Sequence, residues 1–354
     1  MGLMGLMGLM GDVPGVSRAA LAVFLSDAVD AASAQAPPAE AMRVSLLSGG
    51  RSNLTYRVDW GPHRWVLRRP PLGHVLRTAH DMKREARVLT ALAPTAVPVP
   101  AVVAICEDET VIGATFYVME AVEGLVLRTD EDLARLDAHA AKELAYAFVD
   151  TLADLHNVDP AEVGLADFGR PEGYLERQLA RWSVQLADST CRTVEGFDEL
   201  ARLLAKRRPA SQGHALVHGD YRLDNVIVDP AEPGRVRAVL DWEMATLGDP
   251  LADVGLFHLY WIGWAGIDNP IAGTPGLLPA FPDWSELAER YAHRSNLKLD
   301  DLDWYMAFAA YKLAVILEGI HYRHRSGMTV GEGFEQIGAM VPQLVERGLT
   351  HLRS

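Results

Sequence analysis

The alternation of apolar and polar residues predicts two different parts along the chain. From about residue 40 to 120, short runs of alternating apolar and polar residues, separated by Gly, Pro and Asn, are typical of strands. One run with helical spacing, 79–92, follows the third of them. This part is therefore predicted to be a sheet of about five strands with one helix. The predicted strands cover 42–48, 55–60, 64–69, 97–105 and 115–120.

Beyond about residue 124 the spacing of apolar residues becomes mainly helical. Pro171 occupies a favourable first-turn position in one of these helices. An apolar strand over 235–243 is expected to end at Asp241. The predicted helices of this part cover 132–156, 171–187, 285–295 and 301–325.

The segment before the sheet is predicted to hold one helix. Ser17 is a suitable N-cap for a helix over 18–31, and the Pro-containing segment 34–40 is predicted to be a linker. Residues 1–15 begin with repeats of Gly, Leu and Met that lack the charged start of a signal peptide. We interpret them as a loose tail or an uncertain start of the chain.

The composition is that of a folded protein. Hydrophobic residues make up 49% of the 354 residues and charged residues 23%, which excludes wholesale disorder. The two cysteines, Cys106 and Cys191, form no disulfide framework or metal-binding spacing and indicate a reducing compartment, so we expect a cytoplasmic location. No apolar stretch is long enough to span a bilayer, and no membrane partner is expected.

The net charge of −14 is concentrated in the helical part. Residues 1–125 hold 11 basic and 12 acidic residues, whereas the rest hold 22 basic and 35 acidic residues. This balance argues against nucleic acid as a partner. The excess acid suits either a solvated surface or a pocket for a cationic molecule, and the sequence leaves both open.

The most informative segment is His-Gly-Asp-Tyr-Arg-Leu-Asp-Asn at 218–225. It fits the spacing H-x-D-x-x-x-x-N, and Asp241 follows Asp220 by 21 residues at the end of an apolar run. Phosphoryl transfer requires a carboxylate near the accepting hydroxyl and oxygen ligands for Mg²⁺. We therefore predict Asp220 as the catalytic carboxylate, with Asn225 and Asp241 as Mg²⁺ ligands.

This segment, together with LDWEMATLGDPLADVG after it, resembles the aminoglycoside phosphotransferase family, which includes choline-kinase-like proteins. FGRPEGYLERQLARW and DLDWYMAFAAYKLAVILEGI are similar to the branch whose kinase-like domains are fused to acyl-CoA dehydrogenases. The resemblance covers nearly all of 40–330 and leaves no dehydrogenase segment in the chain. It implies an α+β, bilobal protein-kinase-like fold and ATP with Mg²⁺ as cofactors. The expected divisions are a disordered tail 1–15, a helix and linker 16–39, a nucleotide-clamping N-lobe 40–122, and a catalytic, acceptor-binding C-lobe 123–354.

The resemblance also implies the nucleotide-binding residues. Arg68 stands where kinases carry a strand lysine and should hold the phosphates, with Glu85 as its partner; Arg preserves that role because it is always charged. The strand end 119–122 resembles the hinge that binds adenine, with Met119 lining the pocket and the Glu120 carbonyl and Val122 amide as the backbone groups.

A glycine turn is the remaining nucleotide-binding candidate. Gly49 and Gly50 begin a turn in which the backbone amides and the Ser52 and Asn53 side chains could cradle a phosphate. The turn does not follow the GxGxxG pattern.

Several polar residues in conspicuous positions are predicted to be structural. The triplet 167–169 spells the kinase metal motif Asp-Phe-Gly but precedes Asp220 by 53 residues, whereas the metal loop should follow it. His218 is expected to pack the catalytic loop rather than transfer protons. Other structural candidates are His156 and Asp159 at a helix end, and Asp249 and Asp253, which should cap backbone amides around the catalytic loop.

The predicted activity is transfer of the ATP γ-phosphoryl group to a hydroxyl of a small molecule. Similarity to the dehydrogenase-fused branch favours a hydroxyacyl-CoA or hydroxy acid as acceptor, and Arg323 and Arg325 are the cations considered for such an anion. The alternatives are an aminoglycoside or other antibiotic, and a nucleotide-binding pseudokinase with a regulatory role. The oligomeric state and the choice between ATP and GTP are left open.

Overall fold

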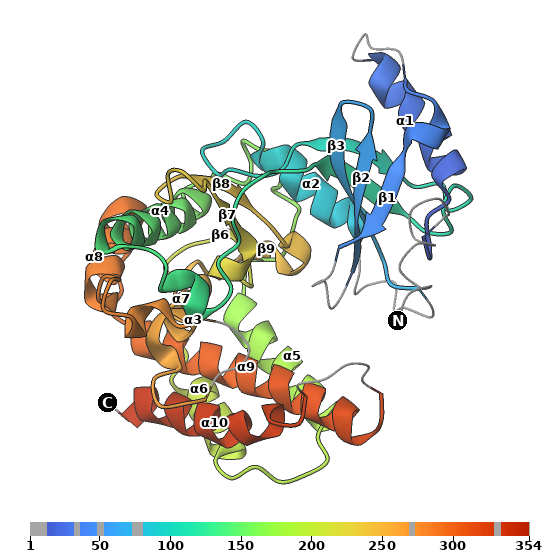
Figure 1. Ribbon diagram of the computed structural model, residues 1–354. Coiled ribbons are helices and arrows are strands. Elements are labelled where there is room, and N and C mark those ends of the chain that lie inside the picture. Colours follow the sequence, from blue (N-terminus) through green and yellow to red (C-terminus); the bar gives the residue numbers. More distant parts are fainter. Residues whose placement is uncertain are drawn as a thin grey trace. The chain divides into compact units, whose positions relative to one another are not determined.

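The computed structural model describes residues 13–31, 36–47, 53–72, 81–268, 273–328 and 334–353. The chain divides into two compact units (Figure 1). The first unit comprises Met1–Glu123 and Ala238–Glu243, and the second comprises Gly124–Arg237 and Met244–Ser354. The predicted phosphate-binding residues Gly49, Gly50 and Ser52 lie outside the described residues.

The first unit is built on a five-stranded antiparallel sheet in the order β1-β2-β3-β5-β4. The prediction of about five strands with one helix after the third is confirmed. The strands are β1 (Arg43–Leu46), β2 (Leu54–Trp60), β3 (His63–Arg69), β4 (Val102–Cys106) and β5 (Phe116–Glu120).

Helices cover the two faces of this sheet. Helix α1 (Arg18–Ala31) packs Leu21 and Leu25 into one apolar core with Leu67 of β3. Because successive strand residues point to opposite faces, Arg68 projects to the other face, where it contacts α2 (Met82–Leu92). Helix α2 begins at Asp81, whose side chain accepts a hydrogen bond from the Arg84 amide at 3.1 Å.

The segment just before α1 is attached to the α1 side of the sheet. The Tyr56 hydroxyl donates to the Pro14 carbonyl at 2.6 Å, and Arg69 donates to the carbonyls of Gly15 and Ile112. Residues 13–15 therefore make defined contacts at the end of the segment predicted to be a tail, and 1–12 lie outside the described residues.

The second unit is mainly helical, in agreement with the expected kinase-like fold. Two short ribbons accompany the helices: β6 (Ala215–Val217) pairs with β9 (Thr246–Gly248), and β7 (Val226–Val228) pairs with β8 (Val236–Val239). The helices are α3 (Asp130–Leu133), α4 (Ala138–His156), α5 (Tyr174–Asp188), α6 (Phe197–Lys206), α7 (Leu251–His258), α8 (Trp284–Ser295), α9 (Leu302–Arg325) and α10 (Ile337–Arg353), and a π-helical turn, Leu259–Gly263, follows α7. No described helix has the length and apolar character needed to cross a membrane.

Local capping accounts for the helix boundaries that the periodicity missed. The predicted helix 132–156 is two helices, because Asp137 caps a new helix by accepting the Ala140 amide at 2.8 Å. The predicted helix 171–187 begins only at Tyr174. Pro171 precedes it, and its carbonyl closes a turn with the Tyr174 amide at 3.0 Å. Strand β8 ends at Val239, two residues before Asp241.

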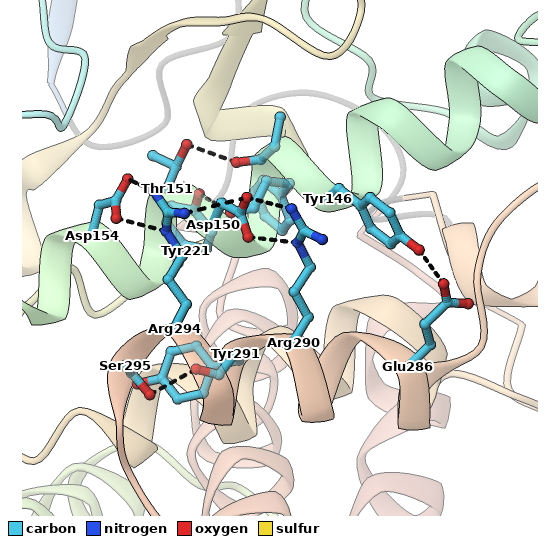
Figure 2. A network of polar contacts seen from close by, with 12 residues as sticks. Tyr146, Asp150, Thr151, Asp154, Tyr221, Glu286, Arg290, Tyr291, Arg294 and Ser295 are labelled. Carbon is cyan, nitrogen blue, oxygen red and sulfur yellow. Dashed lines mark hydrogen bonds and ion pairs between the residues drawn. The ribbon is translucent and has the colours of Figure 1, made fainter.

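A ladder of ion pairs joins α4 to α8 (Figure 2). Asp150 accepts from Arg290 at 2.6 and 2.7 Å, and Asp154 accepts from Arg294 at 2.7 and 2.8 Å. Both acids and both arginines are spaced by four residues, so each set lies along one helix face. The ladder fixes the relative register of α4 and α8.

We expect α1 to stabilise the first unit mainly through its apolar face. Leu25 is fully buried, so Leu25→Ala should lower the free energy of unfolding by about 2–5 kcal/mol. Val23 on the same helix is 74% exposed, and Val23→Ala is the matched control, expected to change stability by less than about 0.5 kcal/mol. Urea unfolding followed by circular dichroism measures both. Equal stability of the two variants would contradict a packed α1.

Candidate active site

The loop after β6 carries the predicted catalytic carboxylate in the second unit. Asn225 ends a 3₁₀ turn, Leu223–Asn225, and its side-chain Nδ2 donates to Asp220 twice: to the backbone carbonyl at 2.9 Å and to the carboxylate Oδ2 at 3.1 Å. This pair of bonds sets the orientation of the Asp220 carboxylate. It also leaves the Asn225 amide oxygen as the acceptor end of that side chain.

A buried carboxylate anchors the same loop. Asp253, in the first turns of α7, accepts the backbone amide of His218 at 2.6 Å and that of Gly219 at 2.9 Å. Gly219 has φ +82°, and a Cβ there would lie 2.8 Å from the Met244 carbonyl oxygen, so only glycine fits. The conformation of the loop therefore depends on the buried Asp253 carboxylate and on glycine at position 219.

Asp253 is held in turn by a buried chain of polar groups. The His156 ring lies between Tyr291 of α8 and Asp253. Its Nδ1 is 2.7 Å from the Tyr291 hydroxyl, and its Nε2 is 3.3 Å from Asp253 Oδ2. Burial alone would raise the pKa of Asp253, but the hydrogen bond and charge of His156, together with His218 and the Gly219 amide, outweigh it and lower that pKa. His156 thus acts as a structural residue that keeps the anchor ionised.

The remaining predicted structural residues also have local roles. His218 is fully buried, and its Nδ1 accepts the Asp220 amide at 3.1 Å. Asp249 caps the start of α7 through the Leu251 amide and accepts the Tyr305 hydroxyl at 2.8 Å. Asp159 accepts the Ala161 amide at 2.8 Å in the turn after α4.

The triplet 167–169 packs against the second unit's own ribbon. Phe168 is buried, and a Cβ at Gly169 would lie 2.5 Å from the Thr246 hydroxyl of β9. Among the described residues, no group of three or more His, Cys, Asp or Glu side chains is arranged to hold a metal ion. The geometry of the triplet is that of a packing element.

Lys312 of α9 is the cation beside the catalytic loop, and the sequence did not single it out. Its Nζ donates to the Gly219 carbonyl at 2.6 Å and lies 5.6 Å from the centre of the Trp182 ring. Burial lowers the pKa of Lys312, against the opposing pull of Asp220. Arg323 and Arg325, the cations considered for an anionic acceptor, are exposed about three turns further along α9. Helical periodicity places Lys312 on α9 but cannot identify the loop it contacts.

In the first unit, Arg68 joins two carboxylates that are far apart in the sequence. Its Nη2 donates to Asp241 Oδ1 at 2.9 Å, and its Nε lies 3.3 Å from Glu85 Oε2, a distance that suits an ion pair although the atoms are not aligned for a hydrogen bond. Burial alone would lower the pKa of Arg68, but neighbouring Tyr117 and the carboxylates raise it. Burial raises the pKa of Glu85, which Arg68 counteracts.

Asn53 belongs to the same cluster of charged groups. It is buried, and its Nδ2 donates to Glu85 Oε1 and to Glu243 Oε2, each at 3.0 Å. The Tyr117 hydroxyl also donates to Glu85, at 3.0 Å. This places the Asn53 amide nitrogen against carboxylates, rather than in the open phosphate-binding turn where it was expected.

Asn225 of the second unit and Asp241 of the first unit each carry an oxygen that suits a magnesium ion. An amide oxygen and a carboxylate are the hard oxygen ligands that Mg²⁺ takes, and Mg²⁺ commonly uses one or two protein groups with water and phosphate oxygens. Asp241 is 31% exposed on its side chain and has φ +65°, a rarely populated region for a non-glycine residue. Such strain is concentrated at functional sites.

The predicted adenine-binding segment ends β5. Met119 is buried, whereas Glu120 is exposed. The Glu120 amide donates to the Ala101 carbonyl at 2.9 Å, and the Ala121 amide donates to the Arg64 carbonyl at 3.0 Å. Val122, whose amide is predicted to bind adenine, is the next residue.

Relatives with this sequence pattern are found among much longer proteins. The chain is 34% identical over 319 residues to acyl-CoA dehydrogenase family member 11 of chicken (Gallus gallus). This alignment covers 88% of this chain and 40% of that protein. Family member 10 of mouse (Mus musculus) is 34% identical over 315 residues, covering 86% of this chain and 29% of that protein. The chain thus spans two fifths or less of the length of these curated relatives.

The chain matches a solved structure in its fold and a family model in its sequence. A crystal structure of a Ralstonia eutropha protein, described as a candidate aminoglycoside phosphotransferase, has a TM-score of 0.82 and 32% identity, covering 95% of this chain and 98% of that one. The family model of the phosphotransferase enzyme family matches residues 43–307, a span that includes both the Arg68 cluster and the Asp220 loop. The chain therefore belongs to the phosphotransferase enzyme family, to which the aminoglycoside phosphotransferases belong.

Proposed function

We propose that the protein is an ATP-dependent small-molecule kinase that phosphorylates a hydroxyl group. The observation that carries this proposal is the Asp220–Asn225 pair on a loop anchored by Asp253. A carboxylate that is oriented before the substrate arrives is what phosphoryl transfer needs from the protein. We also propose a cytoplasmic location, because the two cysteines suit reducing conditions.

In the proposed reaction, Asp220 orients the acceptor hydroxyl and accepts its proton. The acceptor oxygen forms a bond to the γ-phosphorus while the bond from that phosphorus to the β-phosphate oxygen breaks, so the products are a phosphate ester and ADP. Asn225 keeps the Asp220 carboxylate aimed at the hydroxyl. Lys312 fixes the Gly219 carbonyl one residue earlier and acts as a positioning residue.

The proposed roles of the other site residues follow from their charge. Arg68 has further N–H donors besides those facing Asp241 and Glu85 and would bind phosphate oxygens. Asn225 and Asp241 would hold Mg²⁺, which offsets negative charge on the phosphates when bound. Met119, the Glu120 carbonyl and the Val122 amide would receive the adenine, with the Gly49–Gly50 turn and Ser52 near the phosphates.

A hydroxyacyl-CoA or related hydroxy acid is the acceptor we propose. Two similar proteins carry the name acyl-CoA dehydrogenase, which points to acyl-CoA chemistry around this kinase-like part. An antibiotic acceptor is the second candidate, supported by the description of the similar Ralstonia eutropha structure. A pseudokinase is the third, although Asp220, Asn225 and Asp241 are all present.

Removing the Asp220 carboxylate should abolish turnover and spare nucleotide binding. Asp220→Ala is expected to reduce kcat by about 10²–10⁴-fold, because no group then accepts the hydroxyl proton. A mass-spectrometric screen for phosphorylated products, offered hydroxyacyl-CoAs, aminoglycosides, choline and homoserine, identifies the acceptor to be used. Asp188→Ala removes an exposed carboxylate of α5 and is the matched control. Retention of more than a few per cent of activity in Asp220→Ala would refute the assignment of Asp220. Binding of MgATP by the wild-type protein without any phosphorylated product would favour the pseudokinase.

Arg68 should govern nucleotide affinity. We expect Arg68→Met to weaken MgATP binding at least about tenfold, since a charged hydrogen bond is worth roughly 1.5–3 kcal/mol, and Arg68→Lys to be intermediate. Calorimetric titration with MgATP measures this, with Arg64→Met, a half-exposed arginine on the same strand, as control. Wild-type affinity in a folded Arg68→Met variant would exclude a phosphate contact.

The charge of Lys312 should set the alkaline limit of activity. Burial disfavours the charged amine, so Lys312 loses its proton at lower pH than an ordinary lysine, whose pKa is about 10.4. Activity should therefore fall on the alkaline side, and Lys312→Arg should extend it to higher pH, whereas Lys312→Met should lower kcat across the range. The pH profile of kcat/KM is the measurement. An unchanged alkaline limb in Lys312→Arg would show that the amine only packs against the loop.

A further inference from the structure

The end of helix α7 buries a histidine against α8 and α10. His258, the last residue of α7, is 8% exposed. Its ring makes edge-to-face contacts with Trp284 of α8, at 4.9 Å between ring centres, and with His351 of α10, at 5.3 Å. The contact between α7 and α10 therefore includes two imidazole rings.

A permanent cation lies near the two rings. Arg347 precedes His351 by four residues on α10, so both side chains lie on one face of that helix. The Arg347 guanidinium donates to the Ala265 carbonyl, just after the π-helical turn that follows α7. A proton gained by either histidine would therefore add a second positive charge at a contact that already holds one.

The acid that faces this pair of histidines is largely in water. Asp303 Oδ1 of α9 lies 3.8 Å from His351 Nδ1, and the Asp303 side chain is 67% exposed. Such a pair contributes little, because water screens it. Burial lowers the pKa of His258 to about 3, and the charges of His351 and Arg347 add to this effect. Burial also lowers the pKa of His351, which Asp303 opposes and Arg347 reinforces.

We propose that this contact is an acid-sensitive latch, which releases the last turn of α10 from α7 when His258 and His351 gain protons. In the closed state both imidazoles are neutral. In the open state they are in water and bind protons as ordinary histidines do. Opening uncovers the His258 end of α7, the helix that also carries Asp253. The inference does not depend on the proposed kinase function, because no substrate takes part in it.

The last turn of α10 can open while the rest of the helix stays packed along α9. Arg353 pairs with Glu199 at 3.3 Å and with Glu346 at 3.7 Å, and these side chains are about half exposed or more, so both pairs are weak. The buried Leu352 side chain and the hydrogen bond from Arg207 to the Leu352 carbonyl keep the turn closed at neutral pH.

The direction of the pH effect follows from the two states. A histidine in water has a pKa of about 6.5, whereas the closed latch lowers that of His258 to about 3. Between these values the open state binds more protons than the closed state, so acid favours opening. The ratio of open to closed molecules should rise about tenfold per pH unit below about pH 6 through His258 alone. Above about pH 7.5 these histidines should leave the ratio unchanged.

Amide hydrogen exchange of the full chain between about pH 4.5 and pH 8 tests the latch. The exchange rates are corrected for the intrinsic effect of pH, and residues 347–353 are compared with the middle of α9, 308–318. Protection of 347–353 should fall at least about tenfold per pH unit below about pH 6, while 308–318 stays protected. Equal loss in both segments, or protection of 347–353 that does not vary with pH, overturns the latch.

Substitution of His258 separates its proton from its packing. His258→Phe keeps a ring against Trp284 and His351 but cannot bind a proton, so the fall in protection should become about tenfold less steep per pH unit. His351→Gln should also reduce it. His139→Gln, at an exposed position of α4, is the matched control and should behave as the wild type. An unchanged pH dependence in His258→Phe excludes the latch.

Titration of the histidine ring signals by nuclear magnetic resonance gives a second readout on the wild-type chain. The His258 ring should remain neutral at about pH 5.5 in every molecule whose residues 347–353 are still protected. A charged His258 ring in a closed α10 contradicts the proposal, even if no variant of His258 folds.

Discussion

The Asp253 carboxylate fixes the segment on which the proposed chemistry of the second unit depends. Two backbone amides, those of His218 and Gly219, point at one buried anion, and charge-assisted hydrogen bonds of this kind are about twice as strong as neutral ones. Because the amides belong to the residues just before Asp220, the position of this proposed catalytic carboxylate follows from that of Asp253. The ring of His156 and the hydroxyl of Tyr291 keep the anion in place. The α4–α8 ion pairs are then part of the support of the loop, since His156 lies on α4 and Tyr291 on α8.

The same arrangement explains why the residues around the loop are so restricted. Gly219 must be glycine because its φ is +82° and a Cβ would lie 2.8 Å from the Met244 carbonyl oxygen. Its own carbonyl accepts a hydrogen bond from Lys312. Asn225 then connects the far end of the loop back to Asp220. The loop is thus held by three separate contacts, from Asp253, Lys312 and Asn225. Such preorganisation is what the proposed phosphoryl transfer would require.

Sequence reasoning found those features whose chemistry is expressed in local spacing. The strands of the first unit follow from alternation, and Asp220 and Asn225 follow from their separation of five residues. It could not find contacts made between segments far apart in the chain. Lys312 reaches a loop 93 residues before it, and Asn53 reaches Glu243 across 190 residues. Helix 132–156 was misjudged for a different reason, because the cap at Asp137 interrupts an apolar pattern that continues on both sides.

Part of the acidic excess of the helical part is paired within the fold. Asp150 and Asp154 are paired with arginines of α8, and Glu318 on α9 with Arg192 at 2.8 Å. Asp224, between Asp220 and Asn225 in the sequence, is likewise paired with Arg222. A net charge counted over a sequence therefore does not give the charge that a site offers, because acids that serve as ion-pair partners within the fold are counted with the rest.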